Sequence, residues 1–251
     1  MMRYLFHGSD RRLPTDSNDR IRIGKSRSAV AVWACFVLIT SVFFFRNATA
    51  QPVSVDAGLG LEYFNAPSLN KYLNFAAPGA MPLSAYQSAI QFTAGGEYFL
   101  SREWAIGLEY GYITKTVSSG SALGSQQIDF SYYLPTVMLR RVVVGEGYYI
   151  QFGGGVGYHF GGLNASSPYS DKTADYSCQG LGFKADASLD TQLGEKLYAR
   201  VDAEARAEFM GTLKSGGANN LTYIDYNTEQ PHSVDMSFGG IGITFGIVYY
   251  F

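Results

Sequence analysis

The chain has 251 residues, of which 16% are charged and 15% aromatic, and it contains 29 glycines and 19 tyrosines. This composition is poor in helix formers and rich in residues typical of strands and turns. The mean hydropathy lies close to zero, which excludes a protein built of many transmembrane helices.

The first 50 residues predict an export signal. A leader with seven basic residues precedes a continuous apolar run over 29–45, and residues 48–50 fit a small-residue cleavage site. We therefore expect a signal peptide that is cleaved after Ala50. A retained anchor is the alternative, because about 17 apolar residues can just span a bilayer. The long leader and Arg46, which follows the apolar run, depart from the usual signal, and a wrongly assigned start codon would explain the leader.

Cleavage would leave residues 51–251 as a barrel domain with 11 basic and 18 acidic side chains, a formal charge of −7 (11 − 18). This segment has no basic patch, so we expect no nucleic-acid partner. Cys178 is its only cysteine, so no internal disulfide can form, and we expect an inert thiol. No metal or cofactor motif is present, and we expect neither.

Eight stretches alternate apolar with small or polar side chains, with the period of a β-strand. The fourth is ambiguous in phase around Pro135. The seventh is the clearest, because a helix of that sequence would have no apolar stripe. In chain order the stretches lie at 53–64, 89–100, 104–114, 128–143, 148–160, 181–190, 197–209 and 239–251.

The links between these strands alternate in length. Short links follow the second, fourth and sixth strands, whereas the links at 65–88, 115–127, 161–178 and 211–233 are long. Short turns at one rim and long loops at the other are typical of outer-membrane barrels. We therefore predict an all-β fold, an eight-stranded antiparallel up-and-down transmembrane β-barrel with both termini in the periplasm. A soluble lipocalin-like barrel, apolar inside, is the rival fold.

Aromatic residues gather near the strand ends, as expected of rings in the two membrane interfaces. The predicted girdle consists of Tyr98, Trp104, Tyr110, Tyr112, Tyr158, Tyr249 and Phe251.

If the apolar faces meet lipid, the charged faces share a narrow interior, where buried charges must pair. We expect Arg200 to meet Asp186 or Asp190, and Lys184 to meet Glu204 or Glu109. The predicted interior network consists of Glu62, Glu97, Glu109, Lys184, Asp186, Arg200, Asp202, Glu204, Arg206 and Glu208.

Two stretches carry a family resemblance. The strand "YYLPTVMLRR", followed by "GYYIQFGGGVGYHFGG", resembles the small eight-stranded bacterial outer-membrane β-barrel domains, of the OmpA-like and opacity-like kinds. The alternating ending with Tyr249 and Phe251 resembles the C-terminal strand that the barrel-assembly machinery is thought to read. The resemblance implies location in the outer membrane, contact with its lipid and lipopolysaccharide, and no catalytic motif.

The pattern favours a non-enzymatic protein with a structural role or a surface-contact role through its outer loops. The apolar residues of the 65–88 link are the contact candidates, because apolar loop groups often mark binding surfaces: Tyr72, Phe75, Met81 and Tyr86. One alternative is a narrow channel or a small-solute transport barrel. Another is a lipid-modifying enzyme using His159, although no nucleophile is visibly paired with it.

Overall fold

The structure, a computed structural model, describes residues 53–76, 86–121, 124–167, 170–216, 219–224 and 230–251. The predicted signal peptide at 1–50 lies outside the described residues. Within the described ranges, no helix has the length and apolar character needed to cross a membrane.

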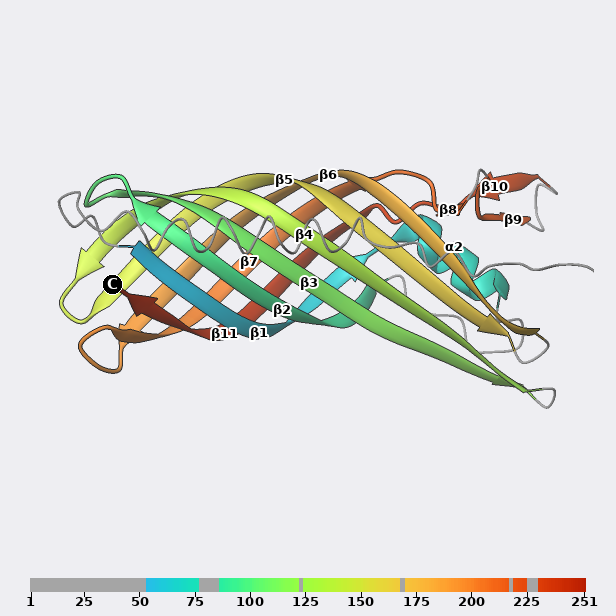
Figure 1. The fold of residues 1–251 in the computed structure, drawn as a ribbon, viewed down its shortest axis with the longest axis horizontal. Helices are drawn as coiled ribbons and strands as arrows, with labels where there is room; N and C mark the ends of the chain where they lie inside the picture. Colours follow the sequence, from blue (N-terminus) through green and yellow to red (C-terminus); the bar gives the residue numbers. More distant parts are fainter. Residues whose placement is uncertain (1–52, 77–85, 122–123, 168–169, 217–218, 225–229) are drawn as a thin grey trace, which may run out of the picture. The chain divides into compact units, whose positions relative to one another are not determined.

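Eight long antiparallel strands close into a barrel (Figure 1). Each pairs with its neighbours in the chain, and β1 pairs with β11 from Ser54↔Tyr250 to Asn65↔Gly239, so every strand of the eight has two neighbours. The predicted fold class is thus confirmed. The barrel strands are β1 (Val53–Asn65), β2 (Tyr86–Phe99), β3 (Trp104–Ser121), β4 (Gly124–Gly145), β5 (Tyr148–Ser167), β6 (Ser170–Gln192), β7 (Leu197–Met210) and β11 (Phe238–Tyr250).

The prediction of long loops at 115–127 and 161–178 is wrong, because the strands continue through these segments as two β-hairpins. The β3–β4 ladder runs to Ser121↔Gly124, and the β5–β6 ladder runs to Ser167↔Ser170 with one irregularity. The serine-rich and glycine-rich sequence there is typical of loops. In the β5–β6 extension the apolar side chain of Leu163 is buried, and next to the β3–β4 extension Ile128 and Phe130 are buried. These side chains belong to one apolar cluster, which holds the extended strands together.

The 65–88 link is not an open loop either. It contains the helix α2 (Pro67–Ala76), which begins on a proline, the residue best suited to a first helical position. Leu69, Tyr72 and Leu73 follow the i, i+3, i+4 spacing of one helix face and are buried. Tyr72 is therefore part of a core and not an exposed contact residue, and burial raises the pKa of its hydroxyl above the ordinary range.

The 211–233 link contains three short strands, β8 (Lys214–Ser215), β9 (Thr222–Ile224) and β10 (Pro231–Ser233). β8 pairs with β6, and β9 pairs with β10 in a separate two-stranded sheet. Buried side chains of this link belong to the same apolar cluster as the buried face of α2. The helix and the described residues of the link together form a cap, which we define as residues 67–76, 211–216, 219–224 and 230–236.

Replacing Tyr72 by alanine should destabilise this cap by about 3 kcal/mol, the cost of removing a large buried aromatic side chain. Amide hydrogen exchange within 67–76 should become faster, while the barrel strands keep their protection. Lys71→Ala, an exposed neighbour on the same helix, is the control and should leave exchange unchanged. Equal protection in both variants would show that Tyr72 does not hold the helix in place.

The interior of the barrel has three layers. At the end with short turns, an aromatic cluster closes the lumen: Phe99, Ala105, Val142, Tyr198, Val248 and Tyr250, with Tyr149 packed against them. Charged side chains fill the middle. At the other end a larger apolar cluster joins inward strand residues such as Phe64 and Tyr132 to the cap.

Candidate functional site: the charged interior of the barrel

The structure places all ten residues of the predicted interior network inside the barrel. Each is buried, because its strand position has the inward parity and the eight strands leave little more than side-chain space. The ion pairs among these residues connect four strands, β2, β3, β6 and β7.

Arg140 on β4 is the centre of the network and is missing from the sequence-based set. Its guanidinium lies 2.5 Å from Glu97, 2.9 Å from Glu109 and 2.5 Å from Asp186. The phase of this strand was ambiguous in the sequence. Arg140 and Arg141 are adjacent, however, and adjacent strand residues face opposite sides. One of the two arginines therefore had to point inward. The pair of adjacent arginines could thus have shown from the sequence that an arginine of this strand belongs to the interior network.

Lys184 and Arg206 form a second group of ion pairs with two glutamates. The Lys184 ammonium lies 2.6 Å from Glu109 and 2.7 Å from Glu204, both of the partners expected for it. Arg206 lies 2.5 Å from Glu204 and 3.1 Å from Glu109. Glu204 is thus shared between two cations, and Glu109 among three including Arg140, which compensates for the loss of hydration.

Arg200 lies nearer the aromatic end and holds Asp190, one of its two expected partners, through two nitrogens at 2.7 and 2.8 Å. It also approaches Glu97 at 3.2 Å and Asp56 at 3.4 Å. The hydroxyl of Tyr250 donates to Asp190 at 2.7 Å. The aromatic cluster is therefore tied directly to the charged layer.

His159 points into the barrel and is fully buried. Its Nδ1 lies 2.5 Å from Glu208 and its Nε2 lies 3.2 Å from the hydroxyl of Thr136. The three side chains resemble the order of a nucleophile, a base and an acid. Thr136 and Glu208 are buried like the histidine, so the three side chains form an interior hydrogen-bond chain. Within the described residues, the second carboxylate oxygen of Glu208, Oε1, has no hydrogen-bond partner.

The outer surface of the barrel is apolar. Outward side chains along the strands, such as Leu59 and Phe245, are more than half exposed, although they are large and hydrophobic. In the predicted girdle, Tyr98, Trp104, Tyr110, Tyr158, Tyr249 and Phe251 are exposed on this surface. Tyr112 is partly buried between the rings of Phe92 and Tyr133. An apolar exterior around a charged interior is the reverse of a soluble barrel.

The chain is a transmembrane β-barrel.

Comparison with known proteins found similar solved structures but no related family or curated sequence. No family model matches the barrel, and no curated protein matches it significantly. Ail of Yersinia pestis is 14% identical, with 81% of this chain and 100% of that chain covered and a TM-score of 0.48. The neisserial surface protein NspA is 8% identical (78% and 96% covered, TM-score 0.48), and OprG of Pseudomonas aeruginosa is 14% identical (80% and 96%, TM-score 0.47). These values assign no function to the barrel.

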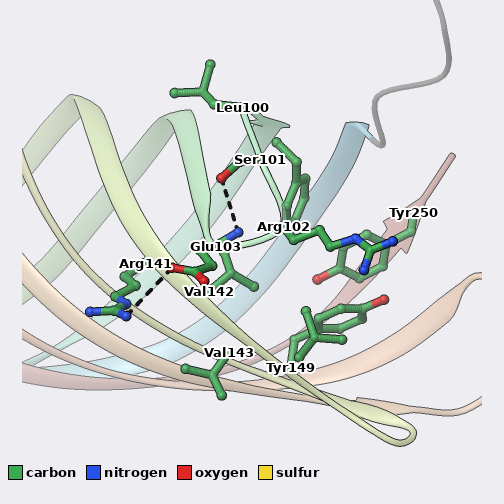
Figure 2. A pocket seen from close by; sticks show the side chains of 11 residues that line it. Leu100, Ser101, Arg102, Glu103, Arg141, Val142, Val143, Tyr149 and Tyr250 are labelled. Carbon is green, nitrogen blue, oxygen red and sulfur yellow. Dashed lines mark hydrogen bonds and ion pairs between the residues drawn. The ribbon is translucent and has the colours of Figure 1, made fainter.

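A cavity of about 690 Å³ lies at the short-turn end of the barrel. Figure 2 shows Arg102 extending toward Tyr250 on one side of it, with Glu103 and Arg141 joined on the other. The rings of Phe99, Tyr149 and Tyr250 that line it belong to or pack against the aromatic cluster. Tyr250 both lines the cavity and donates to Asp190 of the charged layer.

The side chains of the remaining contact candidates lie outside the described part of the structure. Phe75 lies in α2 and Tyr86 begins β2, but their side chains are outside the described ones, and Met81 lies outside the described residues altogether. Cys178 lies within β6 and not in a loop, and it packs against the apolar cluster of the cap.

Proposed function

We propose that the protein is an integral outer-membrane barrel without catalytic activity, which acts as a structural element or through contacts of its outer end. The cap would then face the outside, and the short turns and both termini would face the periplasm. The exposed apolar band supports membrane immersion, because lipid is the environment in which such a surface is stable.

The filled interior of the barrel is the observation that best supports a protein that does not conduct ions. Ion pairs occupy the middle of the lumen, and an apolar cluster lies at each end of them. An eight-stranded barrel has an interior that side chains alone can fill. A narrow channel would need a continuous polar path, and the aromatic cluster interrupts such a path at one end.

The contact surface that we propose lies on the β9–β10 hairpin, in place of the 65–88 link. Ile224 is 53% exposed there, although it is apolar and lies beyond the barrel strands. On the same hairpin, Tyr223 stacks on His232 with ring centroids 5.7 Å apart. Tyr223 is buried and, as the neighbouring strand residue, faces the side opposite to Ile224, so the stack supports the hairpin and Ile224 is the contact residue. An exposed apolar side chain suits a protein or glycolipid partner, and lipopolysaccharide is the nearest candidate.

We further propose that the terminal strand is the part recognised by the barrel-assembly machinery. β11 carries an outward aromatic ring at Tyr249. The exposed ring of Phe251 follows directly after the strand, and the Phe251 amide donates to the Val53 carbonyl across the closing seam. The segment that resembles the terminal strand of outer-membrane proteins is therefore also the segment that closes the barrel.

Single-channel recording of residues 51–251 refolded in planar bilayers tests the non-conducting role. We expect no openings from the wild type or from Arg206→Ala, because both apolar clusters remain in each. Circular dichroism must first show that both proteins are folded. Reproducible wild-type openings whose conductance changes in Arg206→Ala would support the channel alternative instead.

Incubation with lipopolysaccharide followed by mass spectrometry tests the absence of lipid-modifying activity. We expect the lipid mass to be unchanged, because Thr136, His159 and Glu208 are closed to a substrate. Loss of an acyl chain that requires His159, as judged with His159→Ala, would contradict the proposal.

A further inference from the structure

Acidic side chains outnumber basic ones in the charged layer. The layer contains nine carboxylates and four permanent cations. Among the described residues, eight of the nine carboxylates lie within 4.0 Å of an arginine, lysine or histidine nitrogen, and the ninth, Glu62, does not. The carboxylates are Asp56, Glu62, Glu97, Glu109, Asp186, Asp190, Asp202, Glu204 and Glu208, and the permanent cations are Arg140, Lys184, Arg200 and Arg206.

Glu62 lies on β1 at the seam where the first and last strands meet. Its side chain is fully buried, and neither carboxylate oxygen has a hydrogen-bond donor among the residues that the structure describes. The oxygens lie over Gly240 and Gly242 of β11, so closely that a Cβ at either glycine would collide with them. The missing side chains on β11 therefore create the space that the Glu62 carboxyl occupies.

Glu204 faces Glu62 from the other side of Gly242. The strand register pairs Glu62 with Gly242 and Gly242 with Glu204, so the two acids lie in one row with only a glycine between them. Glu204 also accepts from Arg206, Lys184 and Gln91. The two cations nearest Glu62 are thus already engaged by Glu204 and by Glu109.

Gln91 on β2 completes the group. Its Nε2 donates to Glu204 at 2.8 Å, which fixes the orientation of the amide. Its other end, Oε1, accepts no hydrogen bond from any described residue. A Cβ at Gly242 would lie 3.2 Å from this Oε1 and closer still to Glu62 Oε2. Two buried acceptors without donors therefore converge on the same small space.

A proton bound to Glu62 would remove its negative charge and would supply the hydrogen-bond donor that these acceptors lack. An isolated buried carboxylate is costly enough that the group takes up a proton instead, and a like charge nearby favours the same outcome. A metal ion is the other way to neutralise it. Within the described ranges, however, no group of three or more His, Cys, Asp or Glu side chains is arranged to hold one.

We propose that Glu62 is a proton-binding site: in the folded barrel it is a neutral carboxylic acid that donates to the Gln91–Glu204 pair. This hydrogen bond would link β1 to β2 and β7 across the closing seam. The proposal concerns the barrel interior and is independent of what the outer end binds.

Infrared spectroscopy tests this directly in the folded protein at neutral pH, in a detergent without ester groups. The wild type should show the C=O stretch of a protonated carboxylic acid, and Glu62→Gln should lose it. Glu97→Gln is the matched control: it removes an acid that Arg140 and Arg200 hold, and the band should remain.

Urea unfolding of the same proteins gives a second readout. The midpoint of Glu62→Gln should equal or exceed that of the wild type, because a neutral amide replaces a neutral acid. The midpoint of Glu97→Gln should fall, because two buried arginines lose a partner. A comparable fall in Glu62→Gln would overturn the proposal.

Other results would also overturn it. Absence of the band from the wild type would do so, whether or not Glu62→Gln folds, and so would a band that Glu62→Gln retains. A wild-type midpoint that shifts on adding or chelating Ca²⁺, while that of Glu62→Gln does not, would place a cation at Glu62 instead. If Glu62→Gln fails to fold, Gly242→Ala decides: its added Cβ should displace the carboxyl and shift the band, and an unshifted band would count against the proposal.

Discussion

Arg140→Met should lower the free energy of unfolding by about 3–5 kcal/mol, the cost of breaking a buried ion-pair network by removing one partner. Three carboxylates would lose their shared cation: Glu97, Glu109 and Asp186. Glu97 would keep Arg200, and Glu109 would keep Lys184 and Arg206, but each of these cations also holds another acid. Urea unfolding in detergent, followed by tryptophan fluorescence, measures the change.

Arg141→Met is the matched control, one residue along the same strand. The Arg141 side chain points outward, is 62% exposed and lies 3.7 Å from an equally exposed Glu103. Exposed pairs of this kind contribute about 0–1 kcal/mol. Equal destabilisation by the two variants would mean that the Arg140 network does not stabilise the barrel.

Leu108→Arg should destabilise the barrel in phospholipid bilayers by about 2–4 kcal/mol, the cost of an arginine facing the middle of the hydrocarbon layer. Leu108 points outward on β3, four residues beyond the girdle residue Trp104, and is 59% exposed. It has few protein contacts to lose, so the cost would come from the lipid.

Leu193→Arg provides the comparison, because Leu193 is similarly exposed at 62% but lies in the short turn between β6 and β7. Arginine near the interface costs only about 0–1 kcal/mol. A similar effect at both positions would argue that the apolar band does not lie in hydrocarbon.

The barrel could be predicted from the sequence, because the side chains of a β-strand alternate between only two faces of the sheet. In β7 the alternation places Arg200 and Arg206 on one face and Val201 on the other, and the structure has them inside and outside respectively. The antiparallel order followed from the short links, which leave adjacent strands no other way to pair.

The cap and the extended hairpins were not readable, for a physical reason. Their sequences are rich in serine, glycine and asparagine, which favour turns when considered locally. Long-range contacts override that preference: Tyr72 in α2 joins the same buried cluster as Leu221, about 150 residues further along the chain, and as Phe130 in the β3–β4 hairpin. Alternation within one strand carries no information about such partners.

The charged layer also constrains how the barrel can assemble. Arg140 meets Glu97 across 43 positions of sequence, and Lys184 meets Glu109 across 75, whereas Arg200 and Asp190 lie within one hairpin. Hairpins entering the bilayer one at a time would expose most of these charges to lipid without partners, at several kcal/mol each. Insertion and closure should therefore proceed together, with the growing sheet kept in a hydrated setting until β1 and β11 join.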